Sequence, residues 1–385
     1  MTTLQKFIHT LSDHLQKNNA LQKIINKFRT DYSLIACIGV EIEFYLSKNI
    51  DPLEFQTLLG IAVKKEKGAN QFEVDLPPST NIIEYIEKIS STKSKIQIIA
   101  EKLRGNVNFS AKPFASDYGN SMHFHVNFID SSALMNNRLL AEFAAVEEFI
   151  GDTERKTAAY SSVREDLSTG STYKLPTEVE LCKKSNVANP NIIYSFVPTE
   201  KMSFPRRRES SVGCHSHESG NLDPCLRRDD TDVLDLMGQS ICHYMLDTFL
   251  IFMPNEDDYL RLDKNFMAPT NVSFGNNNRT VALRTPDLSP KRLEHRIANP
   301  LTDPYLAIFT ILNSIFLGLK FPDKINNINK IYGNAFDQQY NLVSFPKSLT
   351  EALELFNLEF FIYLNDNRQR ELATLESLLE IMKKL

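Results

Sequence analysis

Residues 119–128 read GNSMHFHVNF, and apolar and polar side chains alternate along this stretch. Successive side chains of a β-strand point to opposite faces of its sheet. The pattern therefore predicts a strand with His123, His125 and Asn127 on one face and apolar side chains on the other. Two imidazoles side by side on a sheet call for a chemical explanation.

The composition is that of a soluble globular protein: 385 residues, 42% hydrophobic and 24% charged. A net charge of −5 gives no electrostatic basis for binding nucleic acid. Apolar runs such as 306–319 are too short to span a bilayer, and the polar, amphipathic N-terminus lacks the apolar core of a signal peptide. Five scattered cysteines do not form a disulfide framework. We therefore expect a cytoplasmic protein that binds neither nucleic acid nor membrane.

The chain divides into three kinds of sequence. Residues 1–33 read as a helical segment, and strand and helix patterns continue through 128. Residues 129–230 are polar and lack sustained periodicity, which predicts an insertion that is largely loop or disordered. Two pieces of it, roughly 141–182 and 203–230, also resemble translated palindromic repeat elements, which a surface loop would tolerate. Ordered patterns resume at 231, with strands at 271–297 and helices from 300 onward.

The predicted insertion contains one possible zinc site. The stretch CHSHESGNLDPC offers Cys214, His215, His217 and Cys225, and four nitrogen or sulfur ligands suit zinc. Their spacing fits no standard zinc arrangement, and no apolar residues support the loop. We therefore do not assign a metal site there.

Acidic residues alternate with apolar ones in the same way elsewhere in the chain. GVEIEFYL (39–46) places Glu41 and Glu43 on one face, NQFEVDL (70–76) does so for Glu73, and KRLEHRI (291–297) for Glu294. Glu66 lies just upstream of the second stretch. A single polar face of this kind commonly points to solvent in antiparallel sheets. Repeated glutamate with histidine is not the usual composition of a solvated strand face. The alternative is that these side chains belong to one functional site.

If these strands form one sheet, the five glutamates and His123 converge. Buried, uncompensated carboxylates are costly and need cations. Oxygen ligands with one imidazole suit Mg²⁺ or Mn²⁺, and five carboxylates suit two or three ions rather than one. Metal ions beside arginines are the usual equipment for phosphoryl transfer. The residues alone therefore suggest an ATP-using, metal-dependent enzyme.

The order of the motifs resembles the catalytic domain of glutamine synthetases. The matching stretches are GVEIEF (39–44), EKGANQFEVDL (66–76), FSAKPFASDYGNSMHFHVNF (109–128), NNNRTVALRTP (276–286), SPKRLEHRIANPLTDPYLA (289–307) and FPKSLTEALELF (345–356). Each motif is weak by itself, but six in order are specific. The resemblance implies an α+β fold, in which a curved, mainly antiparallel sheet is backed by helices. It places the catalytic domain at 34–128 and 231–385 and implies a possible homo-oligomer, because family members form rings.

The resemblance also implies a ligand set for two metal ions. The ion beside the substrate carboxylate would be held by Glu43, Glu66 and Glu73. The ion beside the ATP phosphates would be held by Glu41, His123 and Glu294.

Further roles follow by position in the same motifs. Those implied to contact the nucleotide are His125, Asn127 and Arg284. Those implied to bind glutamate are Gly119, Arg261 and Arg296. Those implied to act on the transferring phosphate are Arg279 and Arg284. The implied reaction is a ligation: the glutamate γ-carboxylate is phosphorylated by ATP, and ammonia or a larger amine then displaces the phosphate.

The chain departs from the family pattern at the ammonium site. The resemblance leads us to expect that residues 1–33 stand where family members carry a small β-grasp domain. Met267, in NEDDYLRLDKNFMAP (255–269), stands where the family has a glutamate that deprotonates ammonium. A thioether is a poor proton acceptor. Two hypotheses follow: a ligase that uses a larger amine, or a non-catalytic relative that still binds nucleotide and metal.

Overall fold

The computed structural model describes residues 3–131, 230–362 and 368–383. Its centre is an eight-stranded sheet with the order β2-β3-β1-β5-β8-β7-β6, and β4 pairs with β1. The strands are β1 (Leu34–Leu46), β2 (Lys64–Lys65), β3 (Gln71–Ser79), β4 (Val107–Asn108), β5 (Met122–Asp130), β6 (Phe274–Asn276), β7 (Leu283–Thr285) and β8 (Leu293–His295). Only the β6–β7 pair is parallel among these strands. The predicted α+β class with a mainly antiparallel sheet is confirmed.

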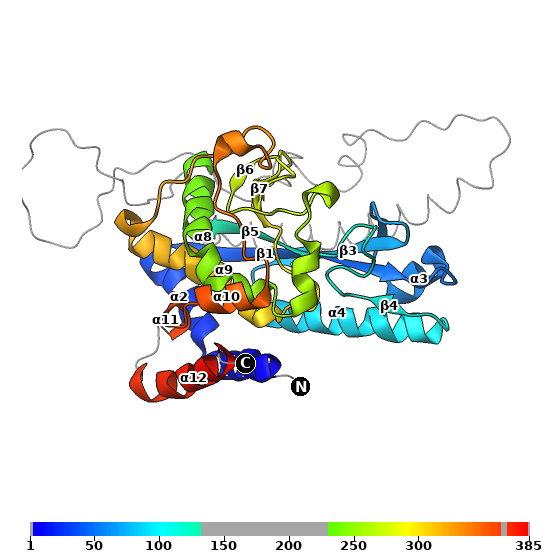
Figure 1. The fold of residues 1–385 in the computed structure, drawn as a ribbon, viewed down its shortest axis with the longest axis horizontal. Helices are drawn as coiled ribbons and strands as arrows, with labels where there is room; N and C mark the ends of the chain where they lie inside the picture. Colours follow the sequence, from blue (N-terminus) through cyan, green and yellow to red (C-terminus); the bar gives the residue numbers. More distant parts are fainter. Residues whose placement is uncertain (1–2, 132–229, 363–367, 384–385) are drawn as a thin grey trace, which may run out of the picture.

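Helices cover one side of this sheet and extend beyond it (Figure 1). The α-helices are α1 (Thr3–Lys17), α2 (Ala20–Tyr32), α3 (Pro52–Leu59), α4 (Ile82–Lys102), α8 (Asp230–Phe252), α9 (Pro304–Lys320), α10 (Leu349–Leu355), α11 (Glu359–Ile362) and α12 (Arg368–Lys383). Four short 3₁₀ helices are also described: η1 (Glu256–Arg261), η2 (Lys264–Phe266), η3 (Pro322–Lys324) and η4 (Gln338–Tyr340). None of the described helices has the length and hydropathy needed to cross a bilayer.

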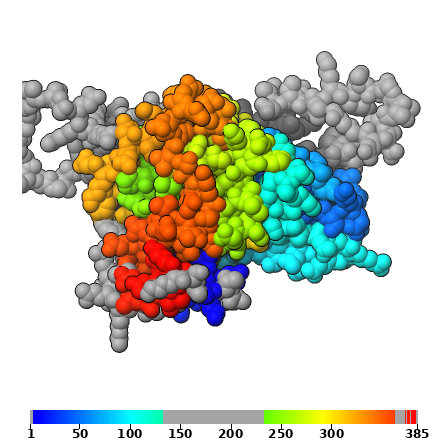
Figure 2. All heavy atoms as spheres, in the orientation of Figure 1, coloured from blue at the N-terminus to red at the C-terminus, as the bar shows by residue number. Residues whose placement is uncertain are grey.

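The first and last helices of the chain lie together. Helix α1 packs against α2 and against α12. Figure 2 shows the blue N-terminal and red C-terminal segments adjoining at one end of the molecule. The segment predicted to be helical, 1–33, therefore contains α1 and α2 and lies away from the polar face of the sheet.

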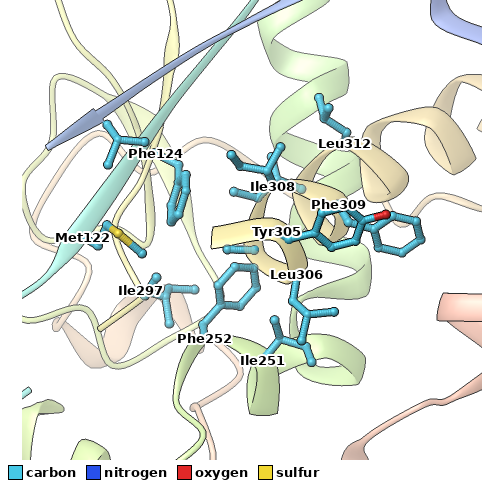
Figure 3. Close-up of a cluster of buried hydrophobic side chains, with 14 of the residues drawn as sticks. Met122, Phe124, Ile251, Phe252, Ile297, Tyr305, Leu306, Ile308, Phe309 and Leu312 are labelled. Carbon is cyan, nitrogen blue, oxygen red and sulfur yellow. The ribbon is translucent and has the colours of Figure 1, made fainter. Parts of the chain in front are cut away.

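The apolar face of β5 forms the centre of the core. Met122 and Phe124 are completely buried and point toward α9 and the end of α8 (Figure 3). Helix α9 presents Leu306 and Phe309 to this layer, and Phe252 closes it from α8. Burying one face so completely fixes the strand's register, because a slip of one residue would exchange the two faces. The core therefore determines which side chains of β5 reach the opposite, polar face.

Two boundaries differ from the sequence prediction. Strand β5 continues to Asp130, because Ile129 and Asp130 pair with Ile35 and Leu34 of β1. The predicted insertion at 129–230 therefore began too early, and its positions 132–229 lie outside the described residues. The stretch between α9 and α10 was predicted to be helical, but apart from η3 and η4 it is irregular. Its turn formers, Asn and Gly, explain the difference.

Phe124→Ala should destabilise the fold strongly. The substitution would leave a cavity between β5 and α9, and such losses typically cost about 3–5 kcal/mol. Chemical denaturation of the purified protein measures the change. Ile98→Ala is the control, because Ile98 is 63% exposed on α4 and its truncation should have little effect. Equal effects of the two substitutions would contradict this account of the core.

Candidate functional site

The polar side chains of four neighbouring strands meet on the face of the sheet opposite the core. Glu41 of β1 pairs in register with His123 of β5, and Glu43 pairs with Glu73 of β3. On the far side of β5, His125 lies opposite Glu294 of β8. The face borders a cavity of about 240 Å³. The alternation seen in sequence thus corresponds to one continuous polar surface.

Two imidazoles hold the carboxylate of Glu41. The Nδ1 atom of His123 lies 3.0 Å from Oε2, and the Nε2 atom of His125 lies 2.9 Å from Oε1. Arg292 donates from Nε to Nδ1 of His125 at 3.0 Å, so Nε2 of that ring carries the proton that faces Glu41. Burial opposes ionisation of Glu41, but hydrogen bonds from both imidazoles outweigh it and lower its pKa. Glu41 is therefore a fixed, ionised carboxylate.

Glu294 is contacted by two arginines, one from β7 and one that follows directly after β8. Arg284 donates from Nη1 to Oε2 at 2.8 Å, and Nε of Arg296 lies 3.3 Å from Oε1. The same Oε1 lies 3.6 Å from Nδ1 of His123. Burial opposes ionisation, but His123 and Arg296 outweigh it and lower the pKa of Glu294. This carboxylate is thus ionised despite being only 3% exposed.

Glu43 and Glu73 have a different environment. Glu43 accepts from the backbone N–H of Ser121 at 2.7 Å and from Nε2 of Gln71 at 3.3 Å. Glu73 is buried beside other carboxylates, and burial together with the charges of Glu41 and Asp75 raises its pKa to about 10. A carboxyl group in this state is stabilised by any cation that replaces its proton.

Three groups of described side chains have ligand atoms close enough to share an ion, all within 4.8 Å of one another. They are Glu41–His123–Glu294, Glu43–Glu73–His123 and Glu41–Glu73–Asp75. The first is the set predicted for the ATP-side metal. The second contains two of the three residues predicted for the other metal. Glu66 lines the same cavity but belongs to none of the three groups in the described part of the chain. Hard oxygen donors with one imidazole fit Mg²⁺ or Mn²⁺.

Arg261 reaches the cavity from η1 and is held by main-chain carbonyls. It donates to Ile297 O at 2.6 Å and to Arg296 O at 2.8 Å. A Cβ atom at Gly119 would lie 2.7 Å from Cγ of Arg261 and 2.6 Å from the carbonyl of Ala111. The glycine predicted to bind substrate therefore also makes room for the arginine predicted to do so.

The base of η1 is anchored by Asp258. Its carboxylate accepts from Asn255 N at 2.8 Å and from Nδ2 of Asn299 at 2.6 Å. Asn299 also accepts from the N–H of Leu301 at 2.6 Å. These bonds join the loop that carries Arg261 to the chain just after β8.

Two predicted residues lie less centrally. Arg279 lines the cavity from an exposed position, and no ion pair of its guanidinium occurs among the described residues. Asn127 lies farther along β5, beyond the described lining of the cavity, and its Oδ1 accepts from Phe128 N at 2.8 Å. The structure thus brings Arg279 to the site but not Asn127.

Several lining residues did not emerge from the sequence. Arg292 shares the face of Glu294 by the alternation in KRLEHRI, but no role in the site was predicted for it. Lys67, Tyr118 and Phe266 come from loops and η2, where no periodicity marks a side chain as facing a cavity. Ser121 contributes its N–H and its Oγ, the latter 2.8 Å from Nε2 of His123.

The chain matches the family model described as the glutamine synthetase catalytic domain over residues 53–151 and 206–363. It is 24% identical over 311 residues to gamma-glutamylputrescine synthetase PuuA of Escherichia coli (strain K12), covering 80% of this chain and 47% of the relative. The chain thus spans about half the length of that relative. The fold matches the solved structure titled GmaS/ADP complex, with a TM-score of 0.57, 14% identity, and 95% and 72% of the two chains covered.

A second kind of similarity covers only a short stretch of the chain. The chain is 67% identical over 48 residues to tRNA pseudouridine synthase B of Rickettsia rickettsii (strain Sheila Smith), which is 12% of this chain and 14% of that enzyme. So high an identity over so short a stretch of a differently named enzyme indicates a shared segment rather than a shared domain.

Glu73→Gln should stabilise the protein in the absence of divalent ions. With its folded pKa raised above the ordinary 4.5, Glu73 costs stability as the pH rises from about 4.5 toward 10. Glutamine removes this cost, so the melting temperature with chelator should rise by about 2 °C or more at pH 8 and by less at pH 5.

Glu87→Gln on the exposed side of α4 is the matched control and should change neither value. A gain for Glu73→Gln that is the same at both pH values, or no gain, would show that the Glu73 carboxyl is not strained by its neighbours.

Gly119→Ala should be destabilising and should displace Arg261. A Cβ at position 119 would lie 2.6 Å from the carbonyl oxygen of Ala111, and this backbone atom cannot move without disturbing its neighbours. Overpacking of this kind costs about 1–3 kcal/mol of folding free energy. Gly39→Ala is the control, since a Cβ there meets its neighbours at an ordinary 3.5 Å. Thermal unfolding of both variants measures the difference, and equal melting temperatures would contradict the tight packing around Gly119.

Proposed function

The chain belongs to the glutamine synthetase catalytic-domain family, and on that premise we propose that it is an ATP-dependent carboxylate–amine ligase. The proposed substrates are ATP, glutamate and ammonia or a larger amine. Mg²⁺ or Mn²⁺, as two or three ions, are the proposed metals. The observation that carries the proposal is the group Glu41–His123–Glu294, in which the three side chains predicted for one ion lie within 4.8 Å of one another.

The metal positions fit the residues present. Glu41 and Glu294 are ionised and fixed, and His123 lies between them. Glu43 and Glu73 would hold a second ion, whose charge would replace the proton on Glu73. Divalent ions at such positions supply charge neutralisation for phosphate oxygens.

The arginines supply the remaining positive charge. Arg284 and Arg296 approach the cavity through their bonds to Glu294, and Arg279 and Arg292 line it as well. Fixed guanidinium groups stabilise the charge that spreads over a transferring phosphoryl group. In the proposed reaction an oxygen of the glutamate γ-carboxylate displaces ADP from the γ-phosphorus. The product of this first step is an acyl phosphate.

In the second step the amine nitrogen attacks the acyl carbon and the bond to phosphate breaks. The surplus proton of the amine passes to a carboxylate of the cavity. Met267 lines the cavity at the position where the family resemblance implies a glutamate. Because a thioether cannot take that proton, an acceptor held by apolar contacts suits this cavity better than ammonium does.

A non-catalytic, nucleotide-binding relative is the second candidate. Arg261, the residue predicted to grip glutamate, donates to two backbone carbonyls. A guanidinium so engaged has fewer donors left for a substrate carboxylate. On this reading the metal and phosphate groups would be used without ligation.

The family match includes both ends of the segment predicted as an insertion, up to 151 and from 206. The short segment shared with a pseudouridine synthase supports our proposal that repeat-element sequence has entered the chain. A homo-oligomer and a cytoplasmic location stay predictions.

Phosphate release from ATP tests the ligase directly. The full chain is incubated with Mg²⁺ or Mn²⁺, with or without glutamate, and with ammonia or hydroxylamine as small acceptors. Release that requires both glutamate and an acceptor is the expected result. ATP binding without release under any of these conditions would favour the non-catalytic candidate.

Glu294→Ala should abolish metal-dependent ATP binding. The substitution removes one ligand of the proposed ion and leaves Arg284 and Arg296 without their shared partner. Calorimetric titration with ATP and Mn²⁺ measures the loss, and Glu87→Ala on α4 serves as the unaffected control. Unchanged ATP affinity would contradict the assignment of Glu294 to the metal.

A further inference from the structure

One wall of the cavity is aromatic and comes from two loops. Tyr118 lies just before β5, and Phe266 and Met267 lie at the end of η2. The two rings meet edge to face, with centroids 5.5 Å apart and planes at 79°. Met267 adopts a left-handed backbone conformation, with φ of 60°, where η2 ends. Together these side chains form an apolar surface in an otherwise charged site.

A lysine lies over each of these rings. Nζ of Lys112 is 3.5 Å from the centroid of Phe266 and donates to the carbonyl of Asp117 at 2.6 Å. Nζ of Lys67, which itself lines the cavity, is 5.6 Å from the centroid of Tyr118. Ammonium groups bind favourably over aromatic faces. One face of each ring is therefore already used by a cation of the protein itself.

We propose that the acceptor is a primary monoamine whose tail carries no positive charge, and that Lys67 and Lys112 select against diamines and polyamines. This inference rests on the proposed ligase function and names the class of its third substrate. In the proposed binding mode the acceptor's reacting nitrogen faces the carboxylates and phosphate groups, and its tail lies against Met267 and the two rings. A second ammonium on that tail would meet two like charges.

The acidic groups near these lysines have other hydrogen-bond partners. Asp117 accepts from Ala69 N and Tyr118 N at 2.9 and 2.8 Å, so its carboxylate is engaged with backbone. Glu66 lines the cavity beside Lys67. Asp263 acts on Lys112 and caps η2 through Asn265 N at 2.8 Å. The lysines are thus the charges that stand directly over the aromatic wall.

Three acceptors of the same length separate the possibilities. Butylamine, putrescine and 4-aminobutyrate share a four-carbon chain and end in an uncharged, a positive and a negative group. The readout is kcat/KM for amine-dependent phosphate release by the full chain with ATP, Mg²⁺ and glutamate. We expect putrescine to be the poorest by about tenfold or more relative to the better of the other two, as like-charge repulsion at short range predicts.

Variants that lack the charges of the two lysines test their role in this selection. The double substitution Lys67→Met and Lys112→Met should reduce the discrimination against putrescine to about threefold or less, because the repulsion disappears while the tail contacts stay. Lys88→Met, on the exposed side of α4, is the control and should keep the original ratio.

Hydroxylamine and ammonia have no tail, so turnover with them tests the ligase function independently of any selection by the lysines. If they support turnover and putrescine equals or exceeds butylamine and 4-aminobutyrate, the inference is overturned and the ligase stands. If the double variant keeps the full ratio, the lysines are not the selecting groups and the inference likewise fails. If no acceptor supports turnover, the proposed function itself fails, and the inference with it.

Discussion

Carboxylates crowd one face of the antiparallel sheet, and the neighbouring strands and loops have to balance their charge. The pairing of β1 with β3 sets Glu43 opposite Glu73, and Glu41, two residues along β1, lies on the same face. Like charges directly opposite one another destabilise a sheet, and burial makes the repulsion stronger. The fold tolerates this arrangement because the other face of β1 and β3 is apolar and packs against α2 and α4.

The counter-charges come from the other half of the sheet. Strands β5, β7 and β8 and the turns around them supply two imidazoles and four arginines that line the cavity. They neutralise Glu41 and Glu294 well, as the lowered pKa values of these two groups indicate. They do not neutralise Glu73, whose pKa is raised to about 10. Cations therefore balance the carboxylates of Glu41 and Glu294, whereas the carboxyl group of Glu73 is not balanced and would favour a bound cation beside it.

Most of this arrangement could be predicted from the sequence because strand alternation is a local signal. Period-two patterns placed Glu41, Glu43, His123 and Glu294 on one face, and the register required by the apolar core then brought them together. Loop residues carry no such signal, so the aromatic wall of Tyr118 and Phe266 was not foreseen. Alternation also does not tell how far along a strand a site extends. Asn127 lies on the same face as His123 and His125, but farther along β5 than the residues that line the cavity.

We expect the polar face to bind divalent ions as a cluster. Counting the Mn²⁺ ions bound to the purified full chain by electron paramagnetic resonance tests it most directly, since free Mn²⁺ gives a distinct six-line signal that disappears on binding. At least two ions per chain are expected at saturation, and fewer when Glu294 is replaced by alanine. A signal that stays that of free Mn²⁺ at all protein concentrations would contradict this expectation.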